Sequence, residues 1–250
     1  MITSPPTFLC ATLRFVLLLA LTQGVYAKED PFKLVQAAVR QDKKLLERRA
    51  AYECTAISKR EKLNSARQVT KTETQSTTLN AGQSPDYETR KAPEGVKGME
   101  EDLRKSSQEE PFNILQIIDH FNYEHAGQET INGVVCHKIR FTPKGGQPFN
   151  NREEKVANEV AGYFWVSVKD QTLMKNKGSL TKPVSVAWFF ATLKEMEFSF
   201  DTKKLPNGDF APSRIQYRFR VQIPFGQIHE QHTRLMKDYR KTSKKIIKSD

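Results

Sequence analysis

The sequence has few of the residue patterns that metal proteins and enzymes display. Its three cysteines and five histidines show no spacing typical of a metal site. His229 and His232 stand three apart in an expected strand, which puts their side chains on opposite faces. No G-x-S-x-G motif, cysteine nucleophile context or phosphate-binding loop occurs. We therefore expect a protein that is not an enzyme, and we expect no metal and no cofactor.

A long hydrophobic run is also missing. A membrane-spanning helix needs about 20 apolar residues, and the apolar run at residues 15–21 is shorter. Arg14 precedes this run and a signal-peptidase site ends at Ala27, which is the pattern of a secretory signal peptide. We predict that residues 1–27 are removed and that residues 28–250 form one domain, soluble in the periplasm.

Acidic residues are in the minority. The chain has 40 Lys and Arg against 29 Asp and Glu, a formal charge of +11. Arg14 is the only charged side chain of the signal segment, so the mature part keeps +10 of this +11. An exported protein seldom meets nucleic acid, and no recognition motif of that class occurs. The basic balance therefore favours a membrane surface or an acidic envelope partner over nucleic acid.

Only two cysteines, Cys54 and Cys136, follow the signal segment. In an oxidising compartment they could form one disulfide. The strand pattern places Cys54 on an apolar face with Tyr52 and Ala56. It places Cys136 on a polar face with Lys138 and Arg140. The sequence leaves both a bridge and two free thiols open.

The stretch from Phe121 to Pro143 predicts a β-hairpin. Apolar and polar residues alternate with the two-residue period of a half-buried strand. Asn132-Gly133 is the dipeptide that accepts positive φ at both centres of a tight turn. The second strand then has one apolar and one wet face: Val135, His137, Ile139 and Phe141 against Cys136, Lys138 and Arg140.

Two helices and two irregular segments are expected beside the strands. Helical spacing predicts an amphipathic helix from Pro31, and packing on its own sheet is the commoner use of such a helix than binding a membrane. Residues 80–110 lack apolar rhythm and predict a flexible excursion, and residues 240–250 form a basic tail. A short apolar helix at residues 111–118 is our lid candidate, through Ile114, Leu115 and Ile118.

Strand patterns fill most of the remaining chain, at about residues 52–63, 68–79, 162–169, 173 onward, 195–201, 214–223 and 228–239. A short helical patch is expected near residues 152–160. Sequential hairpins with one apolar face make an antiparallel sheet. We predict an α+β, mainly β fold: a strongly curved antiparallel sheet, an unclosed half-barrel, with the N-terminal helix and the short apolar helix covering its concave face.

In this order of segments the chain resembles the periplasmic lipoprotein-carrier superfamily, the LolA/LolB-like fold. The segments that carry the resemblance are the helix after a signal peptide, Tyr52-Glu53-Cys54, the Phe121–Pro143 hairpin with Glu129–Gly133 at its turn, Gly162–Asp170, and Phe210-Ala211-Pro212 before a basic strand. The resemblance implies an unclosed barrel with helices over an apolar cavity. In that family the cavity takes acyl chains of lipoproteins or other lipids.

The large apolar side chains of the expected strands are the candidate ligand-binding residues. They either fill the core under the helices or line the cavity: Phe121, Tyr123, Ile139, Phe141, Phe164, Trp188, Phe190, Phe198, Phe200, Tyr217 and Phe219. We expect a monomeric, non-enzymatic carrier or binder of lipid or lipoprotein acyl chains, with a membrane-surface or envelope protein receptor. The alternative is an interaction module, filled by its own helices, whose basic face of Arg214, Arg218 and Arg220 docks an acidic partner.

Overall fold

The computed structural model describes residues 29–82, 117–187 and 191–242. The predicted signal peptide, most of the excursion, the first part of the short apolar helix and the end of the basic tail lie outside these ranges. Residues before Pro31 form a separate unit, and every element below belongs to the unit from Pro31 onward. No helix in the described ranges has the length and apolar character to cross a membrane.

The elements follow the predicted order of an N-terminal helix and successive hairpins, with the expected short helix near residues 152–160. They are α2 (Pro31–Arg49), β1 (Tyr52–Leu63), β2 (Val69–Asn80), the 3-10 turn η2 (Ile118–His120), β3 (Phe121–Ile131), β4 (Val134–Pro143), α4 (Arg152–Ala157), β5 (Val160–Ser167), β6 (Leu173–Leu180), β7 (Val184–Ala187), β8 (Ala191–Lys204), β9 (Phe210–Ile223) and β10 (Gly226–Lys241). Strand β7 was not predicted.

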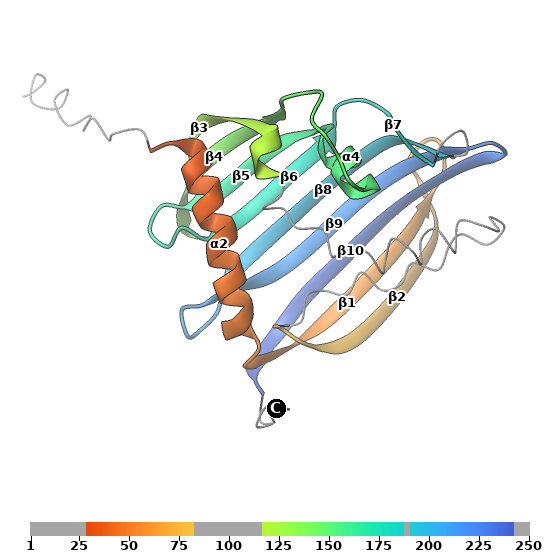
Figure 1. Cartoon of the computed structure of the whole chain (residues 1–250). Helices are drawn as coiled ribbons and strands as arrows, with labels where there is room; N and C mark the ends of the chain where they lie inside the picture. Colours follow the sequence, from red (N-terminus) through yellow and green to blue (C-terminus); the bar gives the residue numbers. More distant parts are fainter. Residues whose placement is uncertain (1–28, 83–116, 188–190, 243–250) are drawn as a thin grey trace, which may run out of the picture. The chain divides into compact units, whose positions relative to one another are not determined.

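The strands form one sheet of ten, with the order β2-β1-β10-β9-β8-β6-β5-β4-β3 and β7 paired to β8. Each pairing is antiparallel. Strands β2 and β3 are the ends of this order, so the described sheet is open, and it curves around α2 (Figure 1). The predicted fold class, an unclosed and curved antiparallel sheet with an N-terminal helix, is confirmed.

The β3–β4 hairpin shows how local sequence sets this architecture. Asn132 has φ of 49° and Gly133 of 78°, the two positive values that a tight hairpin turn requires. A bulge between His125 and Gln128, beside Gly127, shifts the pairing register. Bulges strengthen local twist, and twist helps this end of the sheet to curl.

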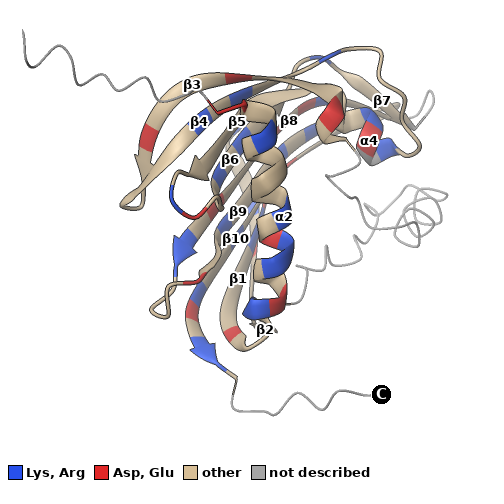
Figure 2. Ribbon diagram, turned by 60° about the vertical axis from the view of Figure 1, so that its left-hand side comes forward, with Lys and Arg blue, Asp and Glu red and all other residues tan. Residues whose placement is uncertain are grey.

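Helix α2 packs on the concave face, as the periodicity predicts. Its buried residues include Leu34, Val35 and Ala38, which join the main core cluster. The rest of the helix surface has both basic and acidic residues (Figure 2). At its end the guanidinium of Arg49 is buried, donating from Nε to the Phe210 carbonyl at 2.8 Å and from Nη2 to Asp42 at 2.8 Å. These bonds fix the helix against the start of β9.

The face predicted to be wet is partly buried, which corrects the simple alternation. Trp165 is only 5% exposed although it shares a face with Lys138. Its indole N–H donates to Glu129 at 3.0 Å, and the Lys138 and Lys175 ammonium groups lie over the ring at 5.3 and 5.4 Å. Long side chains with charged tips thus cover an aromatic ring on the outer face.

The bridge that the sequence left open is not formed. Cys54 and Cys136 are both free and buried. They pack in different clusters, Cys54 with Ala56 and Met236, Cys136 with Trp165. Burial raises the pKa of the Cys136 thiol to about 11, so this thiol is protonated at neutral pH and is a poor nucleophile.

The short apolar helix expected at residues 111–118 lies mainly outside the described residues. Its end is a turn followed by η2, in which Ile118 is buried. Tyr123 donates to the Ile118 carbonyl at 2.9 Å, which ties this turn to β3.

Candidate binding site on the concave face

Half-buried aromatic residues line the concave side of β8 and β9. The two-residue period of β8 brings Met196, Phe198 and Phe200 to this side, and β9 pairs with it in register. Phe198 faces Tyr217, and Met196 faces Phe219. Tyr217 and Phe219 stack with their ring centroids 6.3 Å apart. We call Phe198, Phe200, Tyr217 and Phe219 the aromatic row.

Gly178 on β6 makes room for the first ring of this row. A Cβ at this position would lie 2.6 Å from a ring carbon of Phe198, far inside van der Waals contact. The ring of Phe198 therefore lies across β6, where only glycine leaves space. Met196 and Phe198 also pack against the main core cluster. The aromatic row is thus continuous with the core and extends it beyond the part that α2 covers.

The structure divides the eleven predicted cavity residues into three groups. Five pack in or against the core under α2: Phe121, Tyr123, Ile139, Phe141 and Phe164. Phe141 contacts Phe121 edge-on at 5.4 Å and stacks on Phe164 at 4.7 Å. Four form the half-buried aromatic row. Trp188 and Phe190 lie outside the described residues, as do the lid candidates Ile114 and Leu115, whereas Ile118 is in the core.

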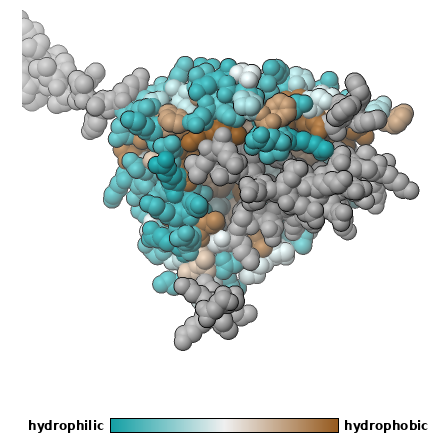
Figure 3. All heavy atoms as spheres, viewed as in Figure 1, coloured by the Kyte–Doolittle hydropathy of each residue, from teal (hydrophilic) through white to brown (hydrophobic). Residues whose placement is uncertain are grey.

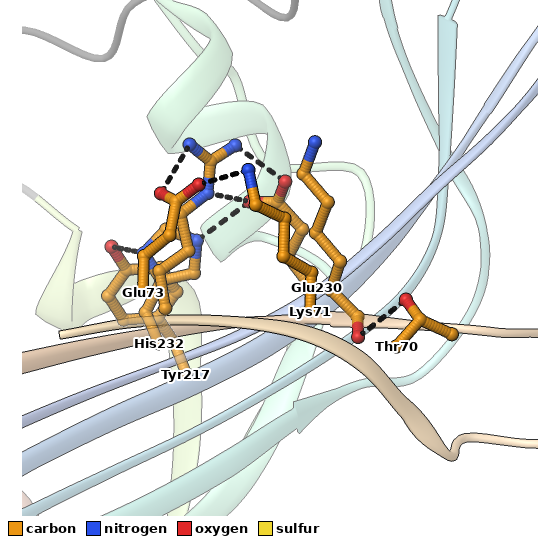
Figure 4. Close-up of polar contacts among 8 residues, drawn as sticks. Thr70, Lys71, Glu73, Tyr217, Glu230 and His232 are labelled. Atoms are coloured by element: carbon orange, nitrogen blue, oxygen red, sulfur yellow. Dashed lines mark hydrogen bonds and ion pairs between the residues drawn. The ribbon is translucent and has the colours of Figure 1, made fainter.

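A polar network adjoins the row on the next strands. The Tyr217 hydroxyl lies 3.1 Å from His232 Nδ1, and His232 Nε2 lies 2.9 Å from a Glu230 oxygen. Arg60 donates to both oxygens of Glu230, from Nε at 2.9 Å and from Nη2 at 2.6 Å. Figure 4 shows Tyr217, His232 and Glu230 on one side of the strands. These side chains connect β9, β10 and β1 across the concave face.

Glu230 is the buried centre of this network, with 5% of the residue exposed. Burial alone would raise the pKa of its carboxyl, but hydrogen bonds from His232 and Arg60 outweigh burial and lower the pKa to about 2. The same contact raises the pKa of Arg60. The carboxylate is therefore ionised at neutral pH, and it holds the Arg60 guanidinium in a fixed plane.

The polar side chains on β1 and β2 next to Arg60 are mostly cationic. Lys71 lies 2.7 Å from Glu73, and Arg60 lies 4.0 Å from the other oxygen of Glu73. Lys62 is paired in register with Lys71, and it is exposed. Lys71 and Glu73 extend from the same side of β2 as the rest of the network (Figure 4). We call Arg60, Lys62, Lys71, Glu73, Glu230 and His232 the concave polar strip.

The predicted basic face lies on the opposite, convex side. Arg218 donates to Glu197 and Arg220 to Glu195, each at 2.5 Å. Arg214 donates to Gln216 at 2.6 Å. The register of β8 against β9 sets each glutamate beside its arginine. Two of these three arginines are therefore already neutralised by the neighbouring strand.

Two hollows lined by described residues lie away from the aromatic row. One, of about 220 Å³, lies between the end of α2 and the β8–β9 turn, beside Arg48 and Asp209. The other, of about 510 Å³, is a polar hollow beside the β3–β4 turn that includes Lys175, Asp201 and Arg214. In the view of Figure 3, hydrophobic residues reach the surface beside α2, bordered by hydrophilic ones.

The sequence analysis did not predict this polar network, although the strand pattern of β10 could have indicated one part of it. The two-residue period places Glu230 and His232 on one side of β10, and the expected separation of His229 from His232 is confirmed by their partners, Arg220 and Tyr217. The pairing of β1 with β10 joins residues 170 positions apart, as in the Arg60–Glu230 bond. No local pattern encodes that register.

Several solved structures align with this chain over most of its length. A DUF1329 family protein from Desulfovibrio piger is 13% identical, with 86% of this chain and 94% of that chain covered and a TM-score of 0.37. A putative outer membrane lipoprotein-sorting protein domain from Vibrio parahaemolyticus is 11% identical, with 84% and 94% covered and a TM-score of 0.37. A LolA superfamily protein from Nitrosomonas europaea is 9% identical, with 84% and 94% covered and a TM-score of 0.31.

No family model matches the sequence, and a search of curated proteins finds no relative.

Proposed function

We propose that this protein binds, and carries, the acyl chain of a lipid or lipoprotein on the concave face of its open sheet. The observation that supports this is the aromatic row. Four large aromatic side chains are half-buried beside a core that α2 already covers. A row of this kind offers an acyl chain an apolar surface at a site that is largely preformed.

The energetics of such a site suit a carrier. Each methylene removed from water is worth about 0.8 kcal/mol, so burying a dozen methylenes gives about 10 kcal/mol before the cost of ordering the chain. The net affinity is then high enough to hold a lipid during transit. Release requires a receptor that competes for the chain, and a membrane surface or an envelope protein is the partner we propose.

The polar network favours binding over catalysis. Tyr217, His232 and Glu230 follow the order hydroxyl, imidazole, carboxylate that activates nucleophiles in some enzymes. Here the bidentate contact with Arg60 already neutralises Glu230, so the carboxylate has less charge to stabilise an imidazolium. We propose a non-enzymatic protein that acts in the periplasm as a monomer, after removal of its signal peptide.

The alternative of an interaction module with a basic docking face receives less support. Arg218 and Arg220 would have to leave Glu197 and Glu195 before they could bind an acidic partner. Exchanging one exposed ion pair for another yields little free energy.

Titration of the mature protein with a fluorescent fatty-acyl probe tests the proposal. We expect saturable binding that Phe219→Asp weakens at least tenfold, because the carboxylate would be buried against the acyl chain. The matched control is Phe225→Asp, since Phe225 at the β9–β10 turn is fully exposed. Circular dichroism and thermal melting establish that both variants are folded. Equal probe affinity in the folded variants would refute a site at the aromatic row.

A further inference from the structure

The concave face changes its chemistry from strand to strand. From β8 to β9 it presents the aromatic row, and from β10 to β1 and β2 it presents the concave polar strip. Tyr217 and His232 lie at the boundary, with their rings stacked at 4.7 Å. Phe219 lies 5.8 Å from the same imidazole. An apolar surface and a charged surface are therefore adjacent, in the order that an amphiphile would need.

The charge of the polar end is positive. Among the described residues, the concave strip holds the cations Arg60, Lys62 and Lys71 against the carboxylates of Glu73 and Glu230. Arg234 adds a further cation on the same side of β10, and its Nε donates to Ser58 at 3.1 Å. This excess of cations is adjacent to the aromatic row and separate from the paired arginines of the convex face.

Two of these cations retain capacity for a ligand. Glu230 occupies Nε and Nη2 of Arg60, whereas Nη1 lies 4.0 Å from Glu73, beyond hydrogen-bond distance. The Arg60 side chain is 37% exposed, so this part of the guanidinium can be reached. The Lys62 ammonium is exposed and makes no ion pair within the described ranges. A buried carboxylate thus orients one cation, and a second lies beside it on the same strand.

We propose that the concave polar strip binds the anionic head of the amphiphile whose acyl chain lies on the aromatic row. This inference rests on the proposed function and specifies its ligand class as anionic lipids. The head would be a carboxylate or a phosphate, because both accept hydrogen bonds from a guanidinium and charge from lysines. Arg60 and Lys62 provide the direct contacts, and Lys71 stays paired with Glu73 beside them.

The dimensions agree with this placement. Strand β1 is three places from β8 in the sheet order, and neighbouring strands lie about 4.8 Å apart. A head at Arg60 therefore lies about 14 Å from the β8 end of the aromatic row. A long acyl chain spans that distance, and it would cross Tyr217 and Phe219 on the way.

Calorimetric titration of the mature protein with single-chain amphiphiles tests the inference. The probes share a hexadecyl-length chain and differ in the head: hexadecyl phosphate, palmitate, the neutral methyl palmitate and hexadecyltrimethylammonium, each below its aggregation threshold. Inorganic phosphate is added as a competitor. At low salt we expect hexadecyl phosphate and palmitate to bind at least about tenfold tighter than methyl palmitate, since each nearby cation contributes about fivefold. The cationic probe should bind weakest.

A charge-reversal pair makes the test specific to the strip. Lys62→Glu should lower affinity for hexadecyl phosphate at least tenfold and leave methyl palmitate within about twofold. The matched control is Lys177→Glu, an exposed lysine on the convex side of β6, which should change neither. Lys62 is exposed, so its replacement should not unfold the protein.

The outcomes separate the inference from the proposed function. Equal affinity for phosphate and methyl ester, unchanged in Lys62→Glu, would overturn the anionic head while leaving the acyl site intact. Effective competition by inorganic phosphate at the affinity of hexadecyl phosphate would also overturn it, because the site would then bind free phosphate. No binding of any amphiphile would overturn both. A preference for phosphate over palmitate would support the inference and identify phospholipid-like heads as the source.

Discussion

The two halves of the concave face have the same alternating strand pattern, but their inward residues differ in how deeply they are buried. Under α2, Ile139 and Phe141 of β4 and Phe164 of β5 are sealed, with 0%, 3% and 6% of each residue exposed. On β8 and β9, inward residues of the same kind such as Phe198 and Phe219 are half-buried, and the inward residues of β10 and β1 include the charged Glu230 and Arg60. Period-two alternation therefore identifies the inner face, whereas the neighbouring element decides whether a residue becomes core or site.

The largest expected difference in stability is between an aromatic residue of the core under α2 and one of the aromatic row. Phe141→Ala should reduce the free energy of unfolding by about 3–5 kcal/mol, because it leaves a cavity among packed rings. Phe219→Ala should cost about 1 kcal/mol, since its side chain is only half-buried, and should instead weaken acyl-probe binding. Urea unfolding and probe titration measure the two effects. Equal stability losses would show that both halves are core.

Substitution of the buried carboxylate of Glu230 should have the next largest effect on stability. Glu230→Gln should lower the free energy of unfolding by about 2 kcal/mol, because Arg60 and His232 lose a charged hydrogen-bond partner. The control is Glu197→Gln, which removes one partner of a pair whose carboxylate is 46% exposed and should cost at most about 1 kcal/mol. Urea unfolding at neutral pH compares them, and a smaller effect at Glu230 would contradict its role as the centre of the network.

Stability should also depend on pH through Glu230. Its folded pKa of about 2 lies below the value of 4.5 for the free side chain. The stabilisation is therefore present above pH 4.5 and is lost as the pH falls from 4.5 toward 2. Urea midpoints measured across this window should fall less steeply for Glu230→Gln than for the unmodified protein. Parallel slopes would mean that the pKa of Glu230 is not lowered in the folded state.

A smaller effect on stability is expected at Gly178, where the core under α2 meets the aromatic row. Gly178→Ala should reduce stability by about 1 kcal/mol, since its Cβ would displace the Phe198 ring. Acyl-probe affinity should change with it, because Phe198 joins the aromatic row to the core. Ser179→Ala, at the next, exposed position of β6, is the matched control. If the two variants behave alike, Phe198 does not depend on the space at Gly178.

The comparison also separates what sequence can predict from what it cannot. The hairpin at Asn132-Gly133 and the helix from Pro31 are encoded by local patterns, and both are confirmed. The assignment of Phe141 to core and Phe219 to the aromatic row depends on where α2 lies. The Arg60–Glu230 pair depends on a register between distant strands. Burial of Trp165 depends on the side chains of Lys138 and Lys175, which cover its ring. An apolar–polar alternation treats both lysines as polar and so does not predict this cover.

Native mass spectrometry of residues 28–250, purified without detergent, is the most direct test of the proposed carrier function. We expect an added mass that disappears on extraction with organic solvent and proves to be an acyl lipid. Adding such a lipid to the extracted protein should restore the added mass, and Phe219→Asp should prevent this while Phe225→Asp should not. A single bare mass that does not change when acyl lipids are added would contradict the carrier function.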